Sequence, residues 1–174
     1  RRVITQDYNL LMRAVMASSG SVFVTDQDEP SGDGELITVS SAGICGSDLH
    51  LISSGLSGVI LGHEFGGFTS DGQLVAVRPT GECGSCAQCT SGFPHTCHQA
   101  AASLHGTSIN GGLAEFVRVE SSRLVPVPGG TDPAAVGLVE PLAVVIHGIN
   151  RVHLISGMSA LVVGSGSIGL LTAA

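Results

Sequence analysis

The sequence is poor in charged and aromatic residues. Only 12% of its 174 residues are charged, tryptophan is absent, and aromatic residues reach 3%. Soluble domains usually carry about 25% charged residues. The charge is also unbalanced, with 7 Lys and Arg against 14 Asp and Glu, a net charge of −7. This acidity argues against a protein that binds nucleic-acid phosphates, which requires clustered Lys and Arg. The scarcity of aromatic residues leaves Val, Leu, Ile and Ala to form the core.

Long uninterrupted hydrophobic runs are also missing. The uncharged, largely apolar stretch over residues 154–174 is broken by serines and glycines and has no flanking aromatic belt or basic anchor, so we predict that it does not span a membrane. Residues 1–11 become polar after two arginines, unlike a secretory signal. The expectation is a cytoplasmic protein whose five cysteines are thiols or metal ligands.

Short apolar runs separated by Gly, Ser and Pro fill the first two thirds of the chain, which predicts an all-β barrel or sandwich. The predicted strands are residues 14–17, 21–25, 35–42, 73–77, 113–119 and 124–127.

The pattern changes after residue 130. Asp132 is a candidate helix N-cap, followed by a proline suited to the first turn. Pro141 is expected to interrupt this helix, with a second helix over residues 142–150. Residues 160–163 are predicted to form a buried strand. Because a parallel strand needs neighbours to pair with, we expect the chain to be a piece of a longer protein.

Four cysteines are spaced for metal binding. Cys83, Cys86, Cys89 and Cys97 lie at offsets of three, three and eight, with turn-forming residues among them. Four thiolates suit tetrahedral zinc and leave no position for a substrate, which predicts a structural zinc site in a lobe over residues 81–98. Free or redox thiols and an iron–sulfur cluster are the alternatives.

A second set of possible ligands lies outside that lobe. Cys45, His63, Glu64 and Glu140 offer a thiolate, an imidazole and carboxylates, a set that can hold zinc with one position open. Taken singly, each has an ordinary explanation, such as a buried cysteine, a hydrogen-bonded loop histidine or a helix-terminal glutamate.

The possible metal ligands belong to a series of motifs along the chain. They are Gly43-Ile44-Cys45-Gly46-Ser47-Asp48-Leu49-His50, Gly62-His63-Glu64, the four-cysteine lobe, Asn110-Gly111-Gly112-Leu113-Ala114-Glu115-Phe116, Glu140-Pro141-Leu142-Ala143 and Gly164-x-Gly166-x-x-Gly169. From Met12 onward the chain resembles the zinc-dependent medium-chain dehydrogenase/reductase family, the alcohol dehydrogenase superfamily.

The resemblance implies a fold and a domain organisation. Residues 12–150 would form a mainly β, GroES-like catalytic domain, an irregular barrel with the zinc-binding lobe. Residues 151–174 would be the first strand and turn of a truncated α/β Rossmann domain. Residues 1–11 would be an extension upstream of Met12, or else an ordinary N-terminal arm.

The resemblance also implies roles around a catalytic zinc. Cys45 and His63 would be direct ligands, with Glu64 and Glu140 competing for the remaining protein ligand. A glutamate at position 140 is more similar to the polyol, sugar and threonine dehydrogenase branches than to the ethanol-oxidising branch. With the four-cysteine site, the expectation is two zinc ions per chain.

Three further residues match the machinery around that metal. Asp48 would accept a hydrogen bond from the zinc-bound imidazole and fix its orientation. Ser47 and His50 match a relay that carries the substrate proton away through the cofactor ribose.

The terminal glycines resemble a dinucleotide-binding turn. Gly164, Gly166 and Gly169 follow an apolar run and precede a helix, the context that such a turn requires. The whole protein is therefore expected to use NAD or NADP. The residue that distinguishes the two cofactors should lie ~20 residues further on, past the end of this chain, and the 174-residue chain alone is expected to lack a competent cofactor site.

The function that the resemblance implies is hydride transfer between NAD(P) and a small alcohol, polyol or sugar, with zinc polarising the substrate oxygen and the whole protein a homo-oligomer. The alternatives are a non-catalytic domain held together by zinc and a zinc-independent reductase of the same superfamily. One departure is the short interval from Cys45 to His63, so the family's substrate contacts in residues 51–59 do not transfer.

Overall fold

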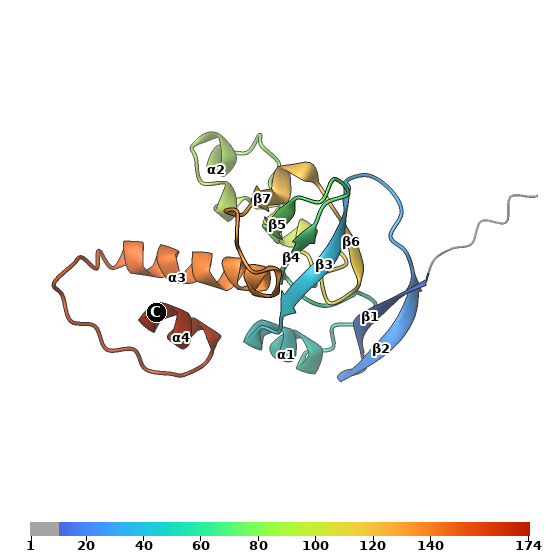
Figure 1. Cartoon of the computed structure of the whole chain (residues 1–174), viewed down its shortest axis with the longest axis horizontal. Coiled ribbons are helices and arrows are strands. Elements are labelled where there is room, and N and C mark those ends of the chain that lie inside the picture. Colours follow the sequence, from blue (N-terminus) through green and yellow to red (C-terminus); the bar gives the residue numbers. More distant parts are fainter. Residues whose placement is uncertain (1–10) are drawn as a thin grey trace, which may run out of the picture.

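A computed structural model describes residues 11–174, which fold around an antiparallel β-sheet (Figure 1). A hairpin of β1 (Leu11–Ser18) and β2 (Ser21–Asp28) lies beside a five-stranded sheet of order β6-β3-β4-β5-β7. The sheet strands are β3 (Glu35–Gly43), β4 (Glu64–Phe68), β5 (Leu74–Val77), β6 (Phe116–Val119) and β7 (Leu124–Pro126). The predicted mainly β architecture is confirmed.

The helices are short and lie around the sheet. They are α1 (Gly46–Ser53), α2 (Ala87–Thr90), α3 (Val139–Arg151) and α4 (Ser167–Ala173), with 3-10 turns at Pro94–Thr96, Ala100–Ser103, Ser121–Arg123 and Pro133–Leu138. In Figure 1 the four-cysteine lobe, marked by α2, extends from one end of the sheet, and α3 projects away from it with α4 alongside.

The main core is aliphatic, as the composition predicts, with one aromatic ring at its centre. Its buried members are Ile37, Phe65, Val75, Val77, Val117 and Val119. Phe65 is completely buried and directly follows His63 and Glu64 in the chain. The core therefore fixes the start of β4, where those two side chains emerge.

β4 is a strand that the sequence pattern does not predict, because its sequence contains two adjacent glycines. The structure shows why they are needed. A Cβ on Gly66 would lie 2.7 Å from the Val136 side chain, and a Cβ on Gly67 would collide with the Thr38 carbonyl oxygen. Glycine weakens a strand in isolation, but here it permits the close packing of β4.

β3 carries a register shift between Val39 and Ser41 where it pairs with β4. As a result Ser40 and Ser41, although adjacent, both bond toward the 3-10 turn Pro133–Leu138: Ser40 Oγ donates to the Pro133 carbonyl, and Ser41 Oγ accepts from the Gly137 amide. A β-bulge of this kind adds one residue and changes which face the following side chains take.

The C-terminal part of the chain departs from the predictions. The predicted strand at residues 160–163 is wrong: the segment has no regular structure, and Leu161 is 90% exposed. The described residues provide no strand beside it, and an unpaired parallel strand has no source of hydrogen bonds.

The predicted helix break at Pro141 is also wrong. α3 begins at Val139 and runs through Pro141, because the amides of the first helical turn have no partner within the helix and proline loses nothing there. The Asp132 cap is confirmed, with its Oδ1 accepting a 2.9 Å bond from the Ala134 amide. The predicted extension, residues 1–11, lies outside the described residues except for Leu11, which begins β1.

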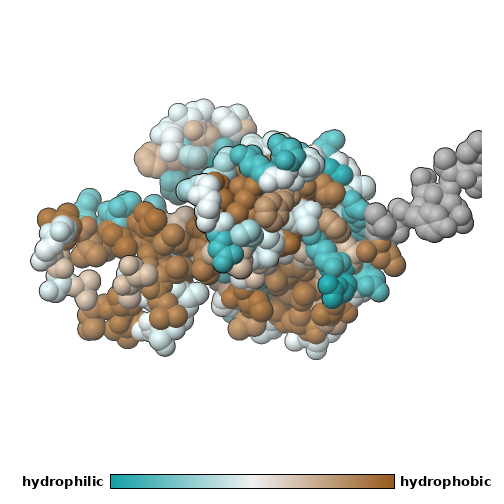
Figure 2. All heavy atoms as spheres, in the orientation of Figure 1, coloured by the Kyte–Doolittle hydropathy of each residue, from teal (hydrophilic) through white to brown (hydrophobic). Residues whose placement is uncertain are grey.

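One helical stretch, Pro133–Arg151, is long and apolar enough to cross a membrane by length and composition, with a mean hydropathy of 1.4. It lies outside the uncharged stretch considered above. Pro141 and Val145 on α3 are buried within the chain, and Figure 2 shows apolar residues on the surface around α3 and α4. Apolar helices that pack inside soluble proteins meet the same test, so the absence of a membrane span stays a prediction.

Candidate active site and metal centres

The four cysteines of the lobe converge on one point. Their sulfur atoms all lie within 4.8 Å of one another. The separations are 3.5 Å for Cys86 and Cys89, 3.8 Å for Cys86 and Cys97, and 3.7 Å for Cys97 and Cys83. A tetrahedron of ~2.3 Å zinc–sulfur bonds has edges of about 3.8 Å, whereas a disulfide needs about 2.0 Å. The spacing therefore fits a metal and not a disulfide.

Backbone amides pre-orient these sulfurs. The Cys86 amide donates to the Cys83 sulfur and the Gln99 amide to the Cys97 sulfur, each at 3.4 Å. Donation from Ser85 lowers the pKa of the Cys83 thiol to about 5, while burial raises the pKa of Cys89. Cys83 is thus a thiolate at neutral pH, and Cys89 must release a proton when a metal binds.

A buried arginine that sequence reasoning missed holds both ends of the lobe. Arg123 Nη1 donates to the carbonyl of Pro79 at 3.3 Å and to that of Ser103 at 2.7 Å, and its Nε donates to Glu120. The local sequence does not reveal this role, because the two carbonyl groups that Arg123 binds are distant in the chain.

A second convergent cluster lies where the start of α1 meets the start of β4. The ligand atoms of Cys45, His63 and Glu64 also lie within 4.8 Å of one another. Cys45 directly precedes α1. His63 directly precedes β4, and Glu64 is the first residue of β4 and pairs with Gly43 at the end of β3. The Glu64 side chain is buried, with an exposed fraction of 5%. A buried carboxylate is costly unless its charge is compensated, so this donor set fits a cation.

Asp48 joins the two segments of this cluster. Its Oδ2 accepts a 2.9 Å bond from the Cys45 amide, and its Oδ1 lies 3.2 Å from His63 Nδ1, although that pair is not aligned for a good hydrogen bond. Asp48 is almost fully buried, and the close contact of its carboxylate with the imidazole, helped by its negative charge, raises the pKa of His63 to about 9. With Nδ1 turned toward Asp48, the Nε2 atom of His63 is the one available to a metal.

Of the two predicted relay residues, Ser47 lies close to the cluster and His50 lies further away along α1. Ser47 Oγ is 3.4 Å from His63 Nε2, the nitrogen left free by Asp48. His50 is exposed one turn further along α1, and no hydrogen bond among the described residues joins it to Ser47.

Glu140, in the first turn of α3, lies outside the three-ligand set. Burial raises the pKa of Glu140, and His63 and Glu64 also act on it electrostatically. Of the two competing carboxylates, the structure groups Glu64 with the thiolate and the imidazole.

Glu140 also borders a cavity of about 620 Å³ between β5, α3 and the four-cysteine lobe. Its walls are mostly apolar, with Arg78 and Thr80 from the chain after β5 as polar groups. His95 and His147 meet edge to face across it, with ring centroids 5.8 Å apart. The cavity has room for a small molecule, and Glu140, which also interacts electrostatically with His63 and Glu64, relates it to the metal-ligand cluster.

The three terminal glycines form a tight turn into a helix. Gly164 has φ +120°, Gly166 is the N-cap of α4, and a Cβ on Gly169 would collide with the Gly164 carbonyl oxygen. The turn requires glycine at positions 164 and 169, whereas a Cβ on Gly166 would meet open space. The segment before the turn is exposed and belongs to no sheet.

Comparison with known proteins identifies the family of this fold. Residues 32–129, more than half of the chain, match the family described as "Alcohol dehydrogenase GroES-like domain". The chain belongs to this family.

Similar members are zinc-type dehydrogenases of polyols and sugars. L-idonate 5-dehydrogenase (NAD(P)(+)) of Escherichia coli (strain K12) is 31% identical over 90% of this chain and 51% of its own length. L-galactonate-5-dehydrogenase of the same organism is 36% identical over 82% of this chain and 46% of its own. A Sinorhizobium meliloti 1021 structure, assigned as a zinc-binding dehydrogenase and bound to NADP, has a TM-score of 0.79 at 32% identity, covering 94% of this chain and 52% of the other. The chain thus spans about half the length of the relatives it matches.

Metal binding at the cluster of Cys45, His63 and Glu64 should depend on pH through His63. The imidazole must lose its proton to become a ligand, and its raised pKa of about 9 opposes this. We expect the zinc affinity of this cluster to rise by about tenfold or more per pH unit from pH 7 to 9, and more slowly above. Asp48→Asn should make that dependence shallower by one proton.

Competition with a chelator at several pH values, with the four-cysteine site already filled, measures both slopes. Equal slopes for the wild-type chain and Asp48→Asn would contradict the role given to Asp48.

Proposed function

We propose that this chain provides the metal centre and part of the substrate site of a zinc-dependent oxidoreductase, which transfers a hydride between an alcohol or polyol carbon and NAD(P). The observation that carries the proposal is the convergence of Cys45, His63 and Glu64 on one point, with Asp48 behind the imidazole. Membership of the alcohol dehydrogenase GroES-like family supports it.

Each residue has a physical task in this proposal. Cys45, His63 and Glu64 would hold the zinc, leaving a fourth position for the substrate oxygen, and bound zinc would stabilise negative charge on that oxygen. Asp48 keeps the His63 ring in one orientation. Ser47 accepts the substrate proton, a role supported by the 3.4 Å between its Oγ and His63 Nε2. His50 would receive that proton at the exposed surface of α1.

The substrate we propose is a small polyhydroxylated molecule. The named relatives act on L-idonate and L-galactonate at position 5, and the cavity beside Glu140 carries Arg78 and Thr80. Burial raises the pKa of Glu140. Its carboxylate form would accept a hydrogen bond from a substrate hydroxyl, and its protonated form could donate one.

The cofactor would be bound by residues 151–174 together with the rest of a nucleotide-binding domain. We propose that these residues are the start of that domain, and that residues 12–150 are the catalytic domain with its lobe at 81–98. The exposed, unpaired segment before Gly164 supports the idea that the 174 residues alone do not bind the nucleotide. We also propose that the whole protein is a homo-oligomer, which rests on the family resemblance.

Metal analysis tests whether the chain binds two zinc ions. We expect two per wild-type chain, one after Cys97→Ser, and one after Cys45→Ser, because each substitution removes a thiolate from a different site. Elemental analysis after gel filtration under reducing conditions gives the count. One zinc in the wild-type chain, lost only on Cys97→Ser, would favour a non-catalytic zinc-binding domain.

The catalytic role of the second site is tested by a matched pair of histidine variants in the whole protein that contains this chain. His63→Asn should lower kcat by at least about a thousandfold, because several kcal/mol of transition-state stabilisation depend on the metal, while cofactor affinity changes little. His153→Asn alters an exposed histidine and should leave kcat unchanged. Wild-type turnover by His63→Asn would overturn the assignment.

The need for further residues is tested with the 174-residue chain by itself. We expect it to bind zinc but to show no dehydrogenase turnover with NAD or NADP on polyols and aldonates, since its glycine turn lacks a supporting sheet. Measurable turnover by the isolated chain would show that no residues outside it are needed to bind the cofactor, and would contradict the proposal.

A further inference from the structure

The turn that carries His63 and Glu64 is held from behind by a loop that plays no part in the proposed chemistry. We call residues 104–113 the asparagine loop. Its Gly111, Leu113 and Gly112 amides donate to the carbonyls of Ile60, Leu61 and Gly62, at 2.8, 2.9 and 2.9 Å. The three residues immediately before His63 are thereby paired one by one with the loop.

The two segments approach more closely than side chains allow. A Cβ on Gly106 would lie 2.8 Å from the backbone of Gly62, and a Cβ on Gly112 would collide with the Phe65 ring. Gly62 itself has φ +94°, which disfavours any other residue. The loop and the turn thus form one backbone-to-backbone seam.

Asn110 makes the side-chain hydrogen bond of this seam. Its Oδ1 accepts a 3.1 Å bond from the Ile60 amide, at the point where the chain enters the turn. Its backbone carbonyl accepts a 2.6 Å bond from Nδ1 of His105. His105 is buried edge-on against the Phe65 ring, 5.5 Å between centroids, and burial lowers its pKa so that it is a neutral donor.

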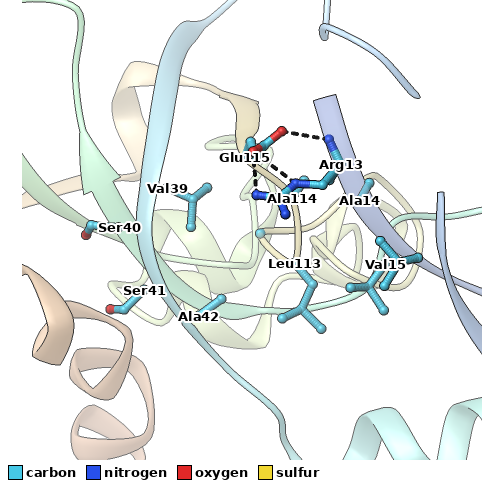
Figure 3. A pocket seen from close by; sticks show the side chains of 12 residues that line it. Arg13, Ala14, Val15, Val39, Ser40, Ser41, Ala42, Leu113, Ala114 and Glu115 are labelled. Atoms are coloured by element: carbon cyan, nitrogen blue, oxygen red, sulfur yellow. Dashed lines mark hydrogen bonds and ion pairs between the residues drawn. The ribbon is translucent and has the colours of Figure 1, made fainter. Parts of the chain in front are cut away.

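The far end of the loop is anchored to β1, so it can act as a fixed support. The Val15 amide donates to the Leu113 carbonyl at 2.8 Å, and the Glu115 amide donates to the Arg13 carbonyl at 3.1 Å. Figure 3 shows the Arg13 and Glu115 side chains paired beside this contact, at 3.0 Å.

We propose that Asn110 is a positioning residue for the metal-ligand cluster of Cys45, His63 and Glu64. It touches none of the three ligands. It fixes the Ile60 amide, and with it the path of the chain into His63, so that the imidazole and the Glu64 carboxylate meet Cys45 at metal-binding distance. The inference rests on the proposed function only in requiring that this cluster bind a metal.

Cobalt titration of the metal-free chain tests this. Co²⁺ bound by four thiolates and Co²⁺ bound by one thiolate, one imidazole and one carboxylate absorb differently, so the two sites report separately in one sample. We expect Asn110→Ala to weaken the three-ligand site about tenfold, the lower end of what is seen when a supporting hydrogen bond is lost, and to change its spectrum. The four-cysteine site should be unchanged.

Two variants serve as controls. Asn110→Asp keeps the Oδ1 acceptor at an exposed position and should restore the affinity and the spectrum. Asn150→Ala removes an exposed asparagine from α3 and should change neither site.

Each outcome is informative. Equal weakening of both sites by Asn110→Ala would mean general destabilisation and would overturn the proposal, as would unchanged binding at the three-ligand site or failure of Asn110→Asp to restore it. A wild-type chain that binds Co²⁺ only at the four cysteines would instead contradict the proposed function.

Discussion

The arrangement of the candidate active site depends on one buried carboxylate. Asp48 binds the Cys45 amide on one side and faces His63 on the other, so it connects the start of α1 to the start of β4. These segments are separated in sequence by the rest of α1 and by residues 54–62, of which 60–62 are held by the asparagine loop. A negative charge is costly to bury unless it is compensated. Because Asp48 is buried and contacts both segments, the distance between the Cys45 thiolate and the His63 imidazole is fixed by the folded core.

The four-cysteine lobe is organised on a different principle. Its regular structure consists of one four-residue helix and a short 3-10 turn, and its interior is formed by sulfur atoms rather than by hydrocarbon. Arg123 ties both ends of this region to the sheet through carbonyl oxygens. The lobe can thus be held firmly at its base while its own order depends on the metal.

Much of this could be predicted from the sequence, for identifiable reasons. Strands marked by short apolar runs between Gly, Ser and Pro were predictable, and so were the four-cysteine cluster and the Asp132 cap, because each depends on residues close together in the chain. β4 was not, since its glycines are required by Val136 and Thr38, which are distant in sequence. The strand at 160–163 was predicted from apolar content alone, and such a strand also needs partners. Only the folded structure shows that Glu64, and not Glu140, lies with Cys45 and His63. The spacing of residues along the sequence does not say which of two carboxylates the tertiary fold brings to the cluster.

The register shift in β3 has a consequence for how the chain can vary in length. Side chains alternate between the two faces of a strand. The extra residue at the shift therefore determines which face each side chain takes from there to Cys45. In Figure 3, Val39 and Ala42 lie on one side of β3 while Ser40 and Ser41 lie on the other. Loss of one residue here would turn the thiol away from the imidazole, although every residue needed for chemistry would still be present. In homologous chains, insertions and deletions should therefore accumulate in residues 51–59 and be rare between the shift and α1.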